Sequence, residues 1–111
     1  MKNFKLSAAD IQRLIPTRLG CIASDKIVVD GSPVGYMYKD KPINPQDSGW
    51  RFLSGEESDE YMADNSRHGV YSLNTLANYD RDIIPLLGAA VGSSFERVDG
   101  GPLMEIWDED A

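Results

Sequence analysis

Apolar and polar residues alternate in several short stretches of the chain, and a period of two is typical of β-strands with one buried face. In 49–53, for example, Trp50 and Phe52 share one face while Arg51 points to the other. Stretches that alternate in this way, or that are rich in β-branched and aromatic residues, are 19–29, 34–38, 49–53, 94–98 and 103–107, with a shorter one at 70–71. The pattern predicts five or six strands.

Turn residues indicate how neighbouring strands connect. Asp30-Gly31-Ser32-Pro33 separates the first two stretches, and Asp99-Gly100-Gly101-Pro102 separates the last two. Glycine, proline and aspartate at this spacing favour tight reversals of the chain. We therefore expect a β-hairpin over 19–38 and a terminal hairpin over 94–107, while 39–48, which is interrupted by two prolines, reads as a loop.

Helical periodicity is confined to short segments. Ser7 and Asp10 can form a capping box before apolar residues at helical spacing, and Pro16 ends that run. This predicts a first helix that packs one face on the sheet. Ser54 and Glu57 can form a second capping box, which predicts a surface helix of about two turns.

Two further helical segments follow in the sequence. Ser72 can cap a third helix in which three apolar residues form one stripe, and Asp82 can cap a buried helical turn over 83–87. No repeating crossover helix joins successive strands, as a doubly wound parallel sheet would need. The prediction is a single α+β domain over residues 1–111, mainly an antiparallel sheet of about five or six strands with two to three short helices, followed by an acidic tail at 108–111.

Composition narrows the classes of partner. The chain has 111 residues, with 18 Asp and Glu against 11 Lys and Arg, so its net charge is -7. That charge repels nucleic-acid phosphates and anionic lipids, so we expect no nucleic-acid ligand and no membrane partner. The sequence shows neither a secretory signal nor an apolar run of about 18 residues, and its single cysteine favours the reducing cytoplasm.

The residues that usually carry catalysis are scarce. Cys21 lies in an apolar stretch and is expected in the core, because a reactive thiolate would need a base and only His68, in the polar loop-like stretch 65–69, could serve. One cysteine and one histidine exclude structural zinc. The segment 88–94 lacks the lysine of a phosphate-binding loop, and 80–82 is not followed by the glycine of a calcium loop. We expect no cofactor, no metal and no catalytic residue.

The densest charge lies on the second predicted helix. Like charges four residues apart on a helix cost roughly 0.2–0.5 kcal/mol per pair. A solvated face, partly neutralised by Arg51 or Arg67, explains the cluster; the functional alternative is a docking surface that steers a basic protein partner. Catalytic carboxylates need unequal environments, whereas these residues look uniformly exposed. The cluster consists of Glu56, Glu57, Asp59, Glu60 and Asp64.

Two residues before this helix complete the candidate surface. Asp47 falls in the expected exposed loop and would extend the acidic ridge. Trp50 is either a core anchor beside Phe52 or an exposed interface aromatic, and burial is favoured. The predicted partner-binding set is Asp47, Trp50, Glu56, Glu57, Asp59, Glu60 and Asp64.

Five ordered segments resemble a bacterial family catalogued as domain of unknown function 2185. They read VGYMY, NPQDSGWRF, SGEESDEY, YSLNTLANYD and GSSFER, and the resemblance runs roughly over 21–98. The family is grouped with predicted immunity proteins of polymorphic toxin systems, small cytoplasmic proteins that bind and neutralise a cognate toxin. The resemblance implies an α+β domain with a protein partner, and it assigns no catalytic residues.

Three functions remain open at this point. The first is a non-catalytic immunity protein that covers a cognate toxin through its acidic surface. The second is a stand-alone interaction or housekeeping domain that forms a homodimer through an edge strand or an apolar patch. The third, ranked last, is a small hydrolase that uses carboxylates with Asn74, Asn78 or tyrosines around a cleft.

Overall fold

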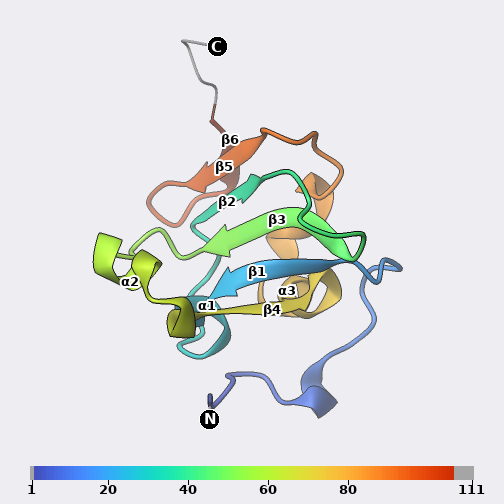
Figure 1. Ribbon diagram of the computed structural model, residues 1–111, viewed down its shortest axis with the longest axis horizontal. Helices are drawn as coiled ribbons and strands as arrows, with labels where there is room; N and C mark the ends of the chain where they lie inside the picture. The colour runs from blue at the N-terminus through green and yellow to red at the C-terminus, as the bar shows by residue number, and fades with distance from the viewer. Residues whose placement is uncertain (1, 107–111) are drawn as a thin grey trace.

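The computed structural model describes residues 2–106, in which a six-stranded mixed sheet has the strand order β4-β1-β3-β2-β5-β6 (Figure 1). Within this part of the chain four strand pairs are antiparallel, and one, β1 with β3, is parallel. The α+β class is thereby confirmed. The predicted tail at 108–111 and the last residue of the terminal hairpin, Trp107, lie outside the described residues.

The strands are β1 (Gly20–Ser24), β2 (Tyr36–Lys39), β3 (Asp47–Leu53), β4 (His68–Ser72), β5 (Ser94–Arg97) and β6 (Leu103–Glu105). The helical segments are η1 (Ala8–Asp10), α1 (Asp25–Val28), α2 (Asp59–Ala63), η2 (Asn65–Arg67), α3 (Leu73–Tyr79) and η3 (Arg81–Leu86).

One face of the sheet carries the hydrophobic core. The helix α3 and the turns of η3 lie behind the sheet in the view of Figure 1, and their apolar side chains join those of α1 and the strands in one buried cluster. The Trp50 ring stacks on Phe52 and Phe95, with centroids 6.2 and 6.3 Å apart. Trp50 and Phe52 therefore share the core face, as their alternation predicts. The other buried members are Cys21, Ala23, Ile27, Val28, Val34, Met37, Leu73, Leu76 and Ile83.

The hairpin predicted over 19–38 is wrong. After β1 the chain forms the short helix α1, whose N-cap Ser24 accepts a hydrogen bond from the Lys26 N–H at 3.1 Å. Ile27 and Val28 are fully buried in this helix. Their burial outweighs the β-preference of branched side chains, since local propensity spans only about 1 kcal/mol. β1 pairs with β3 and β4 instead, and β2 pairs with β3 and β5.

The predicted first helix is also wrong beyond its first turn. The capping contact exists, because the Asp10 carboxylate accepts hydrogen bonds from the backbone N–H and the hydroxyl of Ser7, each at 2.9 Å. Only the 3-10 turn η1 follows, and residues 11–19 contain no helix. We call residues 2–15 the N-terminal strap, because the segment runs outside the sheet and is held to α3.

Two asparagines of α3 explain why no helix continues beyond η1. Asn74 Oδ1 accepts hydrogen bonds from the N–H groups of Leu14 and Ile15 at 2.7 and 3.1 Å. Asn78 Oδ1 accepts from the Gln12 N–H at 2.9 Å, and both side-chain amides donate to the Gln12 carbonyl. Side chains thus take the backbone groups that a helix would have paired internally.

The second predicted helix starts later than expected. Ser54 donates to Glu57 Oε2 from both its N–H and its hydroxyl, at 2.8 and 2.9 Å. That contact closes a turn rather than a helix, because Gly55 has a φ of +94°. Ser58 then caps α2 by accepting a hydrogen bond from Tyr61 N–H at 3.1 Å. No residue of α2 is buried, which confirms its place at the surface.

The C-terminal half follows the predicted elements. Ser72 caps α3 by accepting from the Thr75 N–H at 3.0 Å, and β5 and β6 form the terminal hairpin. The helical turn predicted over 83–87 is η3, although its N-cap is Asp80 rather than Asp82, and Ile83 is its one buried residue while Pro85 is exposed. These elements form as predicted because each depends on residues close in sequence.

Gly35 marks a close approach of two backbone segments. A Cβ at this position would overlap the carbonyl oxygen of Ser54. We expect Gly35→Ala to lower the free energy of unfolding by about 1–3 kcal/mol, because backbone cannot move aside as a flexible side chain can. Gly88→Ala is the matched control, since an added Cβ there meets nothing within 4 Å. Urea denaturation measures both, and equal stability of the two variants would contradict the expectation.

Candidate protein-binding surface

No helix of the described chain covers the second face of the sheet over β1, β3 and β2 (Figure 1). Strand register places Val70, Ile22, Arg51 and Tyr38 in one row across it. The ring of Tyr36 lies next to that of Tyr38, with centroids 5.6 Å apart. We call these five residues the open sheet face.

Apolar side chains enlarge this face at its borders. Ile43, from the loop before β3, is 74% exposed, and Val70 is 76% exposed. Met62 of α2 and Met104 of β6 are also exposed. A hollow of about 350 Å³ between α2 and β4 is lined by Met62, Ile22 and Arg51, among others. Exposed apolar patches with aromatic, methionine and arginine residues are typical of protein-binding surfaces.

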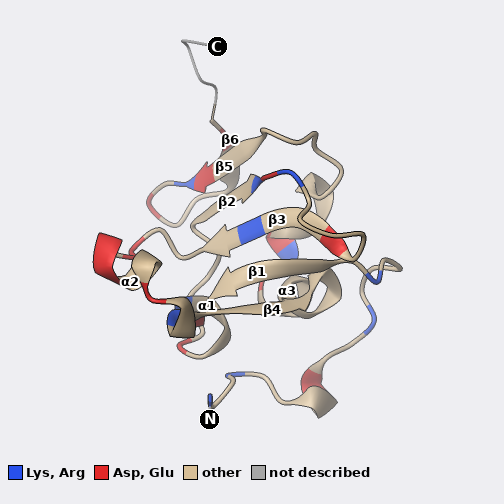
Figure 2. Ribbon diagram, viewed as in Figure 1, with Lys and Arg blue, Asp and Glu red and all other residues tan. Residues whose placement is uncertain are grey.

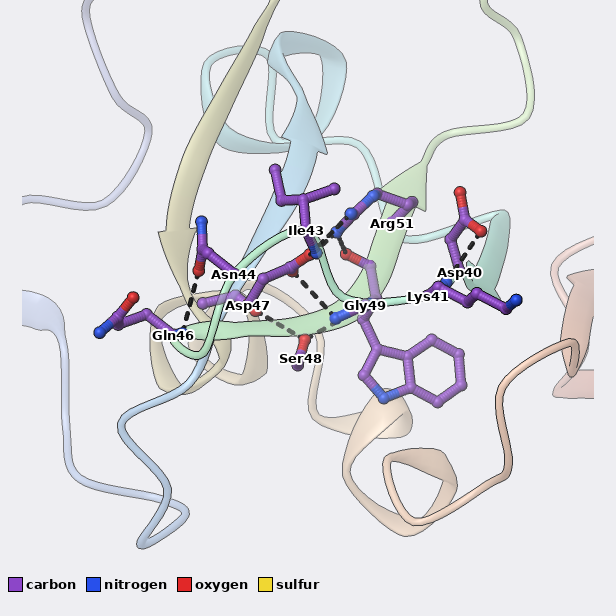
Figure 3. Close-up of polar contacts among 11 residues, drawn as sticks. Asp40, Lys41, Ile43, Asn44, Gln46, Asp47, Ser48, Gly49 and Arg51 are labelled. Atoms are coloured by element: carbon purple, nitrogen blue, oxygen red, sulfur yellow. Dashed lines mark hydrogen bonds and ion pairs between the residues drawn. The ribbon is translucent and has the colours of Figure 1, made fainter.

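Arg51, in the middle of the open sheet face, is fixed in place by Asp47 (Figure 3). The two guanidinium nitrogens Nη1 and Nη2 donate to the two carboxylate oxygens at 2.9 Å each. The same carboxylate accepts hydrogen bonds from the N–H groups of Ile43 and Gly49, also at 2.9 Å. The hydrogen bonds from Arg51 hold the pKa of Asp47 well below its usual range. The pair is therefore ionised and preorganised.

The structure corrects the expected position of Asp47. Its side chain is only 8% exposed, and it begins β3, whereas the acidic residues of α2 come after the end of that strand. At about 3.3 Å per residue, the strand separates them by roughly 20 Å. The continuous acidic ridge expected from the sequence is therefore not formed.

Trp50 lies in the core rather than at the surface. Its side chain is fully buried, and its Nε1–H donates to the Leu87 carbonyl at 3.1 Å. Lys39 Nζ lies 5.6 Å from the centroid of the indole ring. The indole thus has both the burial and the hydrogen-bond partner that a core tryptophan needs, as the sequence favours.

Three carboxylates at α2 point to solvent without a partner. We call Glu56, Asp59 and Glu60 the acidic α2 surface; all three are exposed. Their side chains make no hydrogen bond or ion pair with any residue in 2–106. Figure 2 shows the acidic colouring of α2 at the edge of the molecule, beside the end of β3. These charges remain available to a partner.

The other two acids of the cluster are occupied, so the five are not uniformly exposed as expected. Glu57 is half-buried; burial acts to raise its pKa, but hydrogen bonds from Ser54 prevail and lower it. Asp64 caps η2 by accepting from the Ser66 N–H at 3.0 Å and lies 3.5 Å from Arg67. The Ser66 hydroxyl is the main cause of the lowered pKa of Asp64. Both carboxylates stabilise local turns.

The residues considered for catalysis have structural contacts. Cys21 is buried, and this burial raises the pKa of its thiol, which confirms it as a core residue. His68 is not in an exposed loop: it begins β4, is half-buried, and its Nε2 lies 3.2 Å from the Tyr61 carbonyl oxygen. Asn74 and Asn78, the candidates for a hydrolase cleft, are engaged with the N-terminal strap.

Across residues 2–106, no three His, Cys, Asp or Glu side chains gather closely enough to hold a metal ion. In the same part of the chain, no helix combines the length and the apolar character needed to cross a membrane.

The fold and this surface define a small α+β protein with an uncovered sheet face and free carboxylates beside it. The sequence model of the family described as Immunity protein Imm33 domain matches residues 21–107. The chain therefore belongs to the Imm33 immunity protein domain family. Comparison with curated proteins and with solved structures gave no match. The family match supports the immunity-protein grouping expected from the resemblance, while the narrower label, domain of unknown function 2185, stays a prediction.

The open sheet face is the part of the candidate surface that sequence reasoning missed. Its signal was present in Tyr36-Met37-Tyr38, where two amphipathic rings alternate with a buried methionine. The position of Arg51 beside Tyr38 follows from the pairing of β2 with β3. Register between strands depends on the whole sheet, so one stretch of sequence does not reveal which residues become neighbours.

Proposed function

We propose that this protein neutralises a cognate bacterial toxin in the cytoplasm by binding it, without catalysing a reaction. The observation that carries this proposal is the family match over residues 21–107. The surface that we assign to the toxin combines the open sheet face with the acidic α2 surface. Val70 and the bordering Ile43 are exposed, Ile22, Tyr36 and Tyr38 are half-buried, and the three carboxylates have no partner within the described chain.

The two parts of this surface favour different stages of binding. Exposed charges act at long range and accelerate encounter with a basic partner, whereas aromatic and apolar groups contribute most once water is excluded. Tyr36 and Tyr38 lose little side-chain entropy when they are covered, because each has few rotatable bonds. Arg51 is held by Asp47 and its side chain is only 9% exposed, so it keeps this face rigid and adds no ordering cost on binding.

The net charge of the chain favours a basic partner over a second copy of this chain. A second copy of this chain would bring a further net charge of -7 to the interface, which disfavours a homodimer through this surface. A toxin with a basic surface has the complementary charge. We therefore expect the free protein to be a monomer that associates with a basic partner.

The proposal is tested by isolating the complex and then rebuilding it. Tagged full-length protein is recovered from its native host, the bound polypeptide is identified by mass spectrometry, and both proteins are purified separately. We expect a one-to-one complex in light scattering and loss of the toxin's activity at equal concentrations. A toxin that stays fully active in excess of this protein, or a homodimer as the only assembly, would contradict the proposal.

Charge reversal on the acidic α2 surface should slow association with that toxin. For the variant Glu56→Lys, Asp59→Lys and Glu60→Lys, we expect the association rate at low salt to fall roughly 10- to 100-fold, because electrostatic steering is reversed. The matched control changes net charge equally at Asp30, Asp99 and Glu105, which are exposed elsewhere. Surface plasmon resonance at low and high salt measures both; equal rates in variant and control would place the steering charges elsewhere.

A further inference from the structure

A groove of about 540 Å³ lies where β3 ends and β2 begins, beside α2. Its apolar lining comes from Tyr36, Leu53 and Met62. Glu56 and Glu96 also line this groove, and both residues are exposed. An apolar channel with negative charge is thus built into the border between the open sheet face and the acidic α2 surface.

The backbone around Gly35 keeps this groove in shape. The Gly35 N–H donates to the Leu53 carbonyl at 2.9 Å, and the Gly35 carbonyl accepts from the Arg97 N–H at 2.8 Å. The absence of a side chain at Gly35 lets the Ser54 carbonyl approach closely. Glu57 fixes the next turn by accepting hydrogen bonds from Ser54 and Gly55. The groove therefore exists before any ligand binds, which lowers the entropic cost of binding.

The positive charge that lines the groove is already neutralised. Arg97 is only 11% exposed, and its guanidinium lies 2.8 Å from Asp80 and 3.0 Å from Asp82. It also donates to the carbonyl oxygens of Val34 and Gly101 at 2.9 Å. In contrast, the side chains of Glu56 and Glu96 make no hydrogen bond or ion pair with a described residue. The groove keeps an uncompensated negative charge.

We propose that this groove receives the side chain of an arginine from the toxin. An arginine has an aliphatic stem, which suits the apolar lining, and a planar cation, which can stack on Tyr36 and donate to Glu56 and Glu96. Arginine is favoured over lysine because its guanidinium is more weakly hydrated and presents donors in a fixed plane. The proposal rests on the proposed function and adds the chemistry of one anchoring residue of the partner.

The groove can be tested without the toxin. Isotope-labelled full-length protein is titrated with N-acetyl-arginine amide, and amide chemical shifts are followed by NMR. N-acetyl-citrulline amide is the matched probe, because it has nearly the same shape without the charge. We expect saturable shifts at Gly35, Tyr36 and Gly55 with a Kd of the order of millimolar, and at least about fivefold weaker binding of the citrulline probe.

Variants then show which carboxylates bind the arginine probe. Glu56→Gln with Glu96→Gln should weaken the arginine probe roughly three- to tenfold, whereas Asp30→Asn with Asp40→Asn should leave it unchanged. All four side chains are exposed, so both double variants are expected to fold. Equal binding of the two probes, shifts spread over all acidic sites, or no saturable shift would overturn the arginine site. Such a result leaves toxin neutralisation itself to be decided by the reconstituted complex.

Discussion

Replacing Asp47 by alanine is expected to lower the free energy of unfolding by about 3–5 kcal/mol, since it leaves a nearly buried arginine without its carboxylate. The Arg51 side chain is 9% exposed and would lose both 2.9 Å hydrogen bonds. Two backbone N–H groups, those of Ile43 and Gly49, would lose their acceptor as well. Urea denaturation near neutral pH measures the loss. Asp40→Ala is the control, because Asp40 is exposed and its carboxylate accepts a hydrogen bond only from the neighbouring Lys41 N–H.

The same pair determines how stability depends on pH. Arg51 lowers the pKa of Asp47 in the folded protein, so the carboxylate contributes its full stabilisation above the ordinary aspartate pKa of about 3.9. That contribution is lost as the pH falls through the lower, folded-state value. The wild-type protein should therefore lose more stability on acidification than Asp47→Ala does. Parallel curves of unfolding free energy against pH for the two proteins would show that Asp47 is not the group concerned.

Trp50→Ala should cost a similar amount, about 3–5 kcal/mol, because it leaves a large cavity in the core. The substitution removes the ring that packs between Phe52 and Phe95 and the hydrogen bond to the Leu87 carbonyl. Trp50→Phe keeps an aromatic ring and should cost less, with the loss of one buried hydrogen bond at about 1–3 kcal/mol. Differential scanning calorimetry compares the three proteins.

Trp50→Phe also distinguishes a core residue from an interface residue. Because the indole is fully buried in the free protein, the folded variant should bind the toxin with the wild-type Kd. A variant that unfolds as expected but binds the toxin ten times more weakly would instead place Trp50 in the binding surface, with the protein rearranging to expose it.

Elements set by neighbouring residues were predictable from the sequence. Ser72 caps α3, and the alternation in β3 sends Trp50 and Phe52 into the core. Two of the failures, the hairpin over 19–38 and the first helix, involve partners distant in sequence. No helix continues beyond η1 because Asn74 and Asn78, about 60 residues away along the chain, bind the backbone there; no pattern within 7–15 contains that information.

For the candidate surface, the sequence predicted which residues are acidic but not which of them are free to bind a partner. The sequence locates the acidic cluster, but it does not separate the free carboxylate of Glu60 from that of Glu57, which closes a turn, or of Asp64, which caps one. Those differences depend on which N–H groups the folded backbone brings within reach. Asp47 also differs from its expected exposed position, because its carboxylate pairs with Arg51 on the same strand and is only 8% exposed.

The N-terminal strap lies outside the residues that the family model matches, yet it is hydrogen-bonded to residues inside them. The family match starts at residue 21, yet Leu6 N–H donates to the Tyr79 hydroxyl at 3.0 Å and that hydroxyl donates to the Val28 carbonyl at 3.0 Å. A fragment of residues 21–107 would lack the strap. The side-chain amides of Asn74 and Asn78 would then be hydrogen-bonded to water, and one side of α3 would be exposed. The whole chain, and not residues 21–107 alone, is therefore the protein to use in any assay with a toxin.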